Sequence, residues 1–128
     1  MPMHIANLED LPAFITLDGS GIREIAGPSW TPARNQSLAE ATVPVGSSTI
    51  PHYHVQAEEL YFFQRGTGVL RMADEERSVR PGDCAVIPPG VEHQLTNTGD
   101  EDLVLLCCCA PAYSDEDTVL IDPLVAAG

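Results

Sequence analysis

The stretch PHYHVQAEELYFFQRGTG, residues 51–68, places two histidines one residue apart and two glutamates shortly after them. Because side chains alternate across a β-strand, His52 and His54 share one face. Glu59, Tyr61 and Phe63 also share a parity, so Glu59 can point the same way if the chain bends between them. Two imidazoles and a carboxylate that converge from a β-scaffold are suitable ligands for a borderline divalent metal ion.

A further histidine, His93, lies downstream in PPGVEHQLTN, residues 88–97. Three of the four histidines of the chain therefore fall in two short segments, each beside a carboxylate or a turn. A lone histidine is most often an ordinary surface or core residue. The clustering favours a metal site with His93 as a fourth candidate ligand.

The chain around these segments indicates a β-sandwich or barrel. Its 128 residues suit one domain, and its 11 prolines and 10 glycines break any long helical period. Short apolar runs alternate with turn residues, which is typical of many short strands. These runs lie at 14–17, 37–46, 58–65, 69–72, 78–90, 91–97 and 103–109. The segment up to about residue 32 is the least patterned, and we expect it to cover a barrel edge or to pack on a partner subunit.

The charge balance excludes several function classes. Nineteen acidic residues against six basic ones give a net charge of -13, which repels nucleic acid and anionic membranes. All six basic residues are arginine, and without lysine no Schiff-base or pyridoxal phosphate chemistry is expected. Signal-peptide features and an apolar run of the ~20 residues that span a membrane are both lacking, so we expect a cytoplasmic protein.

Cysteines and acidic triplets have plain structural interpretations. Cys84 and the consecutive Cys107, Cys108 and Cys109 form no disulfide framework. We interpret the three consecutive cysteines as small buried apolar side chains of a core strand, with a redox or catalytic thiol as the alternative. In a strand, Cys108 would point opposite to its two neighbours. The acidic triplets at 74–76, 100–102 and 115–117 are expected to be solvated turns, with calcium binding as the alternative.

The histidine stretch has a defined spacing within a longer pattern. From Gly46 the chain has five residues, His52, one residue, His54, four residues, Glu59, six residues and Gly66. The glycine at the end of the run allows a tight turn between strands.

A second pattern follows after an interval of only fifteen residues. From Gly82 the chain has five residues, Pro88, one residue, Gly90, two residues, His93, three residues and Asn97. Together the two patterns resemble the two signature motifs of the cupin superfamily, and they match at every fixed position. The resemblance covers about residues 38–109, and the short interval is similar to that of small single-domain bacterial cupins.

This resemblance implies an all-β fold, a double-stranded β-helix or jelly roll, with a metal inside the barrel. The family's ligand positions fall on His52, His54, Glu59 and His93. Glu58 is a rival to Glu59, but Glu59 stands seven positions before Gly66, as the motif requires, and Glu58 shares parity with Leu60 and Phe62. One domain over residues 1–128 is expected, with an N-terminal edge segment (1–36), the conserved barrel (37–110) and a C-terminal tail (111–128).

Such a site holds one divalent transition metal, which can be iron, manganese, nickel, cobalt, copper or zinc. If the ion is six-coordinate, two positions stay open for water, oxygen or a chelating substrate. Tyr61, two residues after Glu59, is a candidate general acid or base, or simply fills the barrel. Phe63, Leu95 and Val86 are expected to form an apolar wall. Arg65 and Arg71 either meet a substrate carboxylate or face solvent.

Three functions remain open from the sequence. The favoured one is an oxygenase acting on a small oxygen-rich organic molecule. The second is a redox-neutral isomerase, epimerase or lyase, similar to sugar-phosphate isomerases of the superfamily. The third is a non-catalytic module that binds or senses a small molecule. In each case we expect a homodimer, because Leu60 and Phe62 are predicted to present apolar side chains away from the metal.

Overall fold

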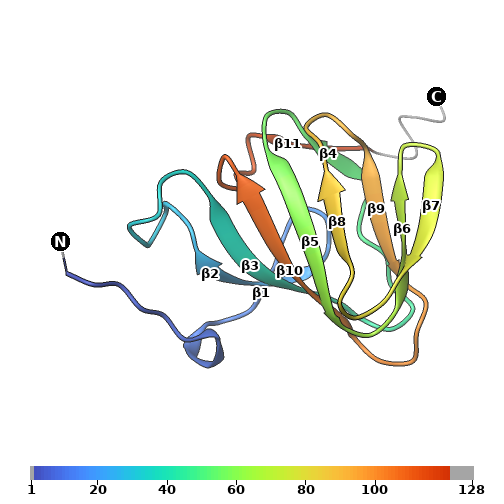
Figure 1. Ribbon diagram of the computed structural model, residues 1–128, viewed down its shortest axis with the longest axis horizontal. Coiled ribbons are helices and arrows are strands. Elements are labelled where there is room, and N and C mark those ends of the chain that lie inside the picture. The colour runs from blue at the N-terminus through green and yellow to red at the C-terminus, as the bar shows by residue number, and fades with distance from the viewer. Residues whose placement is uncertain (1, 122–128) are drawn as a thin grey trace.

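The computed structural model describes residues 2–121 and contains two facing β-sheets (Figure 1). No α-helix occurs among these residues, and the one 3₁₀ turn is η1 (Leu8–Asp10). None of the described residues forms a helix that is long and apolar enough to cross a membrane. One sheet has the strand order β1-β2-β3-β10-β5-β8 and the other has the order β11-β4-β9-β6-β7. This arrangement is the all-β double-stranded β-helix that the sequence predicts.

The strand bounds follow the turn residues closely. The first sheet consists of β1 (Phe14–Ile15), β2 (Gly21–Ala26), β3 (Ser37–Val43), β10 (Leu103–Ala110), β5 (Glu58–Arg65) and β8 (Cys84–Ile87). The second consists of β11 (Thr118–Leu120), β4 (His52–His54), β9 (His93–Asn97), β6 (Gly68–Met72) and β7 (Glu75–Val79). All the pairings within both sheets are antiparallel.

The core forms between the inner faces of the two sheets. Strand β5 shows the reason, because its residues alternate between exposed and buried from Glu58 to Phe63. The core residues come from seven strands: Ala41, Val43, Tyr61, Phe63, Leu70, Val79, Ile87, Leu95, Leu103 and Leu105. One end of the barrel is therefore filled by aliphatic and aromatic side chains, and the polar residues of interest lie beside this core.

The N-terminal segment extends the first sheet rather than lying loosely on it. Strand β2 pairs with β3 over Gly21–Ala26, and β1 pairs with β2. Arg23 in β2 bonds the Glu40 carboxylate in β3, with Nη2 to Oε1 at 2.8 Å. No clear strand signal is found in the sequence here, because every residue of β2 is only partly buried.

The C-terminal tail completes the second sheet, since β11 pairs with β4. Asp117, just before β11, accepts hydrogen bonds from the backbone N–H groups of Gln56 and Ala57 at 2.8 and 3.0 Å. Its triplet is therefore not merely a solvated turn. The expectation for the triplet 74–76 is also partly wrong, because Glu75 and Glu76 are exposed residues of β7 rather than turn residues.

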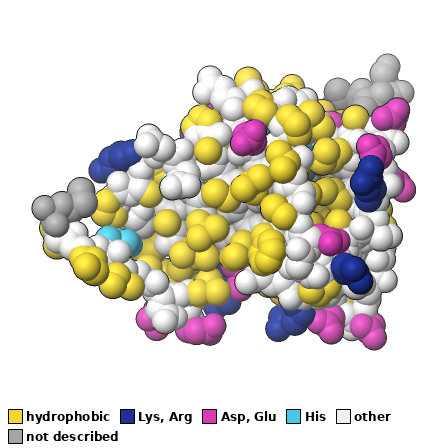
Figure 2. Space-filling model, in the orientation of Figure 1, with side chains coloured by type: hydrophobic (Ala, Val, Ile, Leu, Met, Phe, Trp, Pro, Cys, Tyr) yellow, Lys and Arg dark blue, Asp and Glu magenta, His cyan; other side chains and the backbone are white. Residues whose placement is uncertain are grey.

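The outer face of the first sheet carries an apolar row across four neighbouring strands. Leu38, Cys108, Leu60 and Val86 stand opposite one another in register on β3, β10, β5 and β8. Phe62 and Leu106 are paired in the next row. Figure 2 views the molecule in the orientation of Figure 1 and shows apolar side chains gathered over the middle of this face, with charged side chains toward its edges.

We predict that two glycines of positive φ differ sharply in their tolerance of a side chain. Gly66 (φ +83°) joins β5 to β6, and an added Cβ would lie 2.5 Å from the Asp102 carbonyl oxygen. Gly46 (φ +76°) has nothing within 4 Å of that position. Gly46→Ala should cost about 1–2 kcal/mol through backbone strain alone. Gly66→Ala should cost about 1–3 kcal/mol more, because the strand ends must move apart.

Urea unfolding of both variants, with midpoints converted to free energies of unfolding, measures this difference. Equal losses in the two variants would show that the close approach at Gly66 is not a constraint on the fold.

Candidate metal centre

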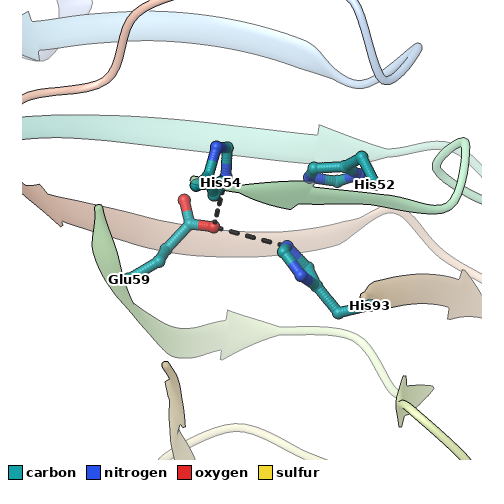
Figure 3. A group of neighbouring side chains, drawn as sticks. All are labelled: His52, His54, Glu59 and His93. Carbon is teal, nitrogen blue, oxygen red and sulfur yellow. Dashed lines mark hydrogen bonds and ion pairs between the residues drawn. The ribbon is translucent and has the colours of Figure 1, made fainter. Parts of the chain in front are cut away.

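Four buried side chains from three strands converge at one point inside the barrel (Figure 3). His52 and His54 come from β4, Glu59 from β5 and His93 from β9. One ligand atom from each lies within 4.8 Å of all the others. His52 and His93 are direct cross-strand partners, which brings their rings together across the second sheet. Glu58 is exposed on the other face of β5, as its parity indicates.

Hydrogen bonds fix the orientation of two of the imidazoles. Nδ1 of His52 lies 2.7 Å from the Ile50 carbonyl oxygen, and Nδ1 of His93 lies 2.9 Å from that of Val91. A carbonyl oxygen can only accept, so each Nδ1 must donate a proton. The Nε2 lone pair of each ring is therefore free to bind a metal ion.

His54 is oriented by a side-chain relay. The Thr118 hydroxyl lies opposite His54 on β11 and can donate to the Ser114 carbonyl oxygen at 2.9 Å. Thr118 Oγ1 is then an acceptor for Nδ1 of His54, which lies 3.1 Å away. Nε2 of His54 faces Glu59, 3.2 Å from Oε1. All three histidines therefore turn Nε2 toward the common point.

The charge of Glu59 requires a cation at this point. Burial alone would raise the pKa of Glu59, but the neighbouring rings of His54 and His93 lower it to about 2. Burial opposes a charge on His54, yet the hydrogen bond and charge of Glu59 overcome this and raise the pKa of His54. A proton shared with His54 can balance the carboxylate, and so can a divalent ion.

His93 provides a separate indication that the site fits a metal. The side chain is fully buried, and Nε2 has no hydrogen-bond partner among residues 2–121. Leaving a buried polar atom unpaired is costly, so an exception of this kind points to a bound water or ion. With three imidazole nitrogens and one carboxylate oxygen, the donor set suits a divalent transition metal. The sequence-predicted ligands are thus brought together, and they form a cluster that can bind a metal.

Two cysteines of β10 also lie at this site. Cys109 stands opposite Glu59 in the register, and its Sγ donates to Oε2 of Glu59 over 3.2 Å. Burial, reinforced by the charge of Glu59, raises the pKa of both Cys107 and Cys109. Both thiols are therefore protonated at neutral pH, and Cys109 serves to hold the carboxylate. Cys108 points to the opposite face, as strand alternation predicts.

A cavity of about 500 Å³ opens beside the cluster and is lined by His52, His54, Glu59 and Tyr61. The ring of Tyr61 packs edge-on to His93, with centroids 5.9 Å apart, and its hydroxyl makes no hydrogen bond within residues 2–121. Burial and the Glu59 charge raise the pKa of Tyr61, so the phenol stays protonated at neutral pH.

The predicted apolar wall is only partly present. Leu95 lines the cavity and Phe63 is buried in the adjoining core. Val86 is 53% exposed, so its assignment to the wall is wrong. Its neighbour Ile87 is the buried residue of β8 instead, because the strand register places Val86 opposite the outward-facing Leu60.

Neither arginine considered from the sequence reaches the cavity. Arg71 bonds Glu92, with Nη1 to Oε2 at 3.0 Å, and lies on β6. Arg65 is largely exposed, with Nε 3.8 Å from Oε1 of Glu101. A substrate carboxylate in the cavity would meet neither of them.

Asp18 is a site residue that sequence reasoning missed. It lies in the turn between β1 and β2 and lines the cavity, with Oδ2 3.7 Å from Nε2 of His52. The sequence TLDGSG, residues 16–21, identifies the turn but carries no signal that the turn returns to the histidines. Only the pairing of β2 with β3 places it there.

The comparisons with known proteins agree with this geometry. An uncharacterized protein of Methanocaldococcus jannaschii is 42% identical over 114 residues, which cover 89% of this chain and 91% of the relative. A variant of Streptomyces PAC13 with uridine has a TM-score of 0.76 at 14% identity, over 94% of this chain and 92% of the other. Oxalate decarboxylase of Lactobacillus farciminis has a TM-score of 0.77 at 23% identity, and the match covers 94% of this chain but 36% of the larger enzyme.

At these identities the two structures show the fold alone. The family model described as "Cupin domain" matches residues 39–109, which is more than half of the chain and includes all four clustered residues. With both motifs, the barrel and the buried histidine–glutamate cluster in place, the chain belongs to the cupin superfamily.

Proposed function

We propose that this chain is a metal-dependent enzyme that binds one divalent transition metal through His52, His54, Glu59 and His93. The observation that carries the proposal is that the four ligand atoms are buried and mutually close, yet three of the four residues also line a cavity of about 500 Å³. Structural metal sites are usually closed, whereas working sites keep an open side. A cavity of this size suits a small organic substrate.

The structural relatives support an enzyme on a small polar molecule without identifying the reaction. One is described as a nucleoside dehydratase, another as an oxalate decarboxylase. Cupin barrels host many activities, so the reaction has to be argued from the residues of this cavity.

The oxygenase chemistry favoured from the sequence and the redox-neutral alternative use the site differently. A bound divalent ion would supply Lewis-acid polarisation of a substrate oxygen in either case. Two observations favour the redox-neutral alternative as a second candidate. The Tyr61 hydroxyl can donate a proton, and the Asp18 carboxylate lies near His52 with one oxygen free of hydrogen bonds within residues 2–121. A donor and an acceptor of protons on one cavity suit a lyase or isomerase.

We predict that metal content depends on the four clustered residues. His54→Ala and His93→Ala should each retain well under half the metal of the wild type after dialysis against a mild chelator, because three ligands cannot supply the same charge and geometry. Elemental analysis by plasma mass spectrometry measures the metal per chain.

Two matched controls are available. His4→Ala removes the fourth histidine, which is exposed, and Glu58→Gln neutralises the exposed neighbour of Glu59. Both controls should bind metal as the wild type does, whereas Glu59→Gln should not. Wild-type occupancy in His54→Ala and His93→Ala would exclude these residues as ligands.

We predict that Tyr61 acts in proton transfer. The prediction can be tested as soon as a substrate is identified. Tyr61→Phe keeps the ring and removes only the hydroxyl, so it should lower turnover by ~10²–10⁴-fold. Turnover measured with and without oxygen separates the two reaction classes, because only an oxygenase needs oxygen. An unchanged rate in Tyr61→Phe would assign the residue to packing, and the absence of any turnover in a substrate screen would favour a binding module.

We also propose that the chain forms a homodimer through the outer face of its first sheet. Leu60, Phe62 and Val86 are 37%, 43% and 53% exposed on this face, although they are large apolar residues. Leu60 and Val86 belong to the uncharged row that crosses four strands, and Phe62 stands in the next row beside Leu106. A contiguous apolar face of this kind is commonly buried against a second copy of the same surface.

This proposal predicts a light-scattering mass near twice 13.7 kDa at micromolar concentration. Phe62→Asp should shift the mass to that of one chain, because a charge would be buried at the interface. Val45→Asp places the same charge on a somewhat more exposed apolar residue in the turn after β3 and should leave the mass unchanged. A wild-type mass of one chain would contradict the proposal, and far-UV circular dichroism verifies that each variant is folded.

A further inference from the structure

The cavity beside the metal centre is lined by acidic side chains and, apart from the histidines of the cluster, by no basic ones. The chain has no lysine, and its six arginines all lie within residues 2–121, yet none of them lines the cavity. Besides Glu59, the lining includes the carboxylates of Asp18, the half-buried Glu24 and the exposed Asp115. No side-chain cation is therefore present to balance an anionic ligand.

Asp18 is held rigidly in its place by its own turn. Its Oδ1 accepts three hydrogen bonds, from Thr16 Oγ1 at 2.7 Å, from the Ser20 backbone N–H at 2.9 Å and from Ser20 Oγ at 2.6 Å. The backbone carbonyl oxygen of Asp18 also accepts from the N–H of Ile50 at 2.7 Å, which ties the turn to the segment before His52. The carboxylate is thus fixed beside His52 through one oxygen.

The second oxygen of Asp18 remains available to a ligand. Oδ2 lies 3.7 Å from Nε2 of His52 and takes no hydrogen bond within the described residues. The Asp18 side chain is only 17% exposed, so its charge acts in a poorly solvated place. Nε2 of His93, which is fully buried and has no hydrogen-bond partner within residues 2–121, belongs to the same site.

The balance of charge then determines which ligands the cavity favours. With three neutral imidazoles, Glu59 cancels one of the two charges of a divalent ion, and Asp18 cancels the other. A dicarboxylate or a phosphate would have to bury its charge against Asp18 with no compensating cation, which is unfavourable. A neutral or cationic molecule avoids this cost and can bond the hydroxyl groups that line the cavity, including those of Ser20, Thr49 and Tyr61.

We propose that this cavity selects neutral or positively charged, hydrogen-bonding small molecules over carboxylate and phosphate anions, with Asp18 as the residue that determines the selectivity. The inference rests on the proposed metal site and adds the charge class of its substrate. In this assignment Asp18 repels or attracts the small molecule in the cavity and does not coordinate the metal.

A direct test compares two small probes that differ in charge. The protein is loaded with cobalt(II), whose visible absorption bands report on its coordination without any need for turnover. Azide, an anion, and imidazole, which is neutral at pH 8, are each titrated into the cobalt protein. The variants are Asp18→Asn, which keeps an oxygen to accept the three hydrogen bonds of the turn, and Glu76→Gln, which removes the same charge from exposed β7.

Asp18→Asn should tighten azide binding by at least about fivefold, because one nearby negative charge is removed. Its affinity for imidazole should stay within about twofold of the wild type, and Glu76→Gln should change neither affinity. If Asp18→Asn keeps its cobalt bands but its azide affinity is unchanged, the charge selection is overturned and the metal site is not. An equal gain in affinity for azide and imidazole would overturn the charge selection in the same way. Loss of cobalt affinity in Asp18→Asn would make Asp18 a metal ligand and overturn the inference. Failure of the wild type to bind cobalt would overturn the metal site itself.

Discussion

The Glu59 carboxylate, almost fully buried inside a barrel of apolar side chains, is the constraint on which the rest of the site depends. A charge in such surroundings persists only when positive charge and hydrogen-bond donors surround it. His54 and His93 face one oxygen of Glu59 at 3.2 and 3.6 Å, and the Cys109 thiol donates to the other. A cation at the meeting point of the three imidazoles would satisfy both the carboxylate and Nε2 of His93, which has no hydrogen-bond partner within residues 2–121.

Strand register brings these groups together. Three contacts of the site join residues that are directly opposite in the sheets: His52 with His93, His54 with Thr118, and Glu59 with Cys109. A shift of one residue in any of these pairings would turn a ligand to the outer face. Gly66 therefore helps to place the clustered residues, although it is not one of them. Asp117, which bonds the backbone just before β5, has the same role.

The sequence predicted those features that local spacing encodes. Alternation in residues 58–65, with the spacing to Gly66, separates Glu59 from Glu58, and alternation in residues 103–109 separates Cys108 from its neighbours. The motif spacing is sufficient to identify the cupin barrel. The orientation of Val86 was predicted wrongly, because the sequence of a four-residue strand does not show which of its alternate residues face the core. Strand β2 and Asp18 were missed for a related reason, since β2 is partly buried along its whole length and its register on β3 is decided by tertiary pairing.

The predicted site residues lie in the barrel motifs, whereas the missed residue Asp18 lies in the segment before them. The ligands come from the barrel motifs, whereas much of the cavity wall comes from the segment before them, through Phe14, Asp18 and Ile22. Residues 112–115, which follow β10, also line the cavity. The candidate metal ligands thus belong to the barrel, while Asp18 and part of the cavity wall belong to the segments on either side of it. A change in those segments can therefore alter the charge and shape of the cavity without any change in the four clustered residues, which agrees with the range of activities that one fold can support.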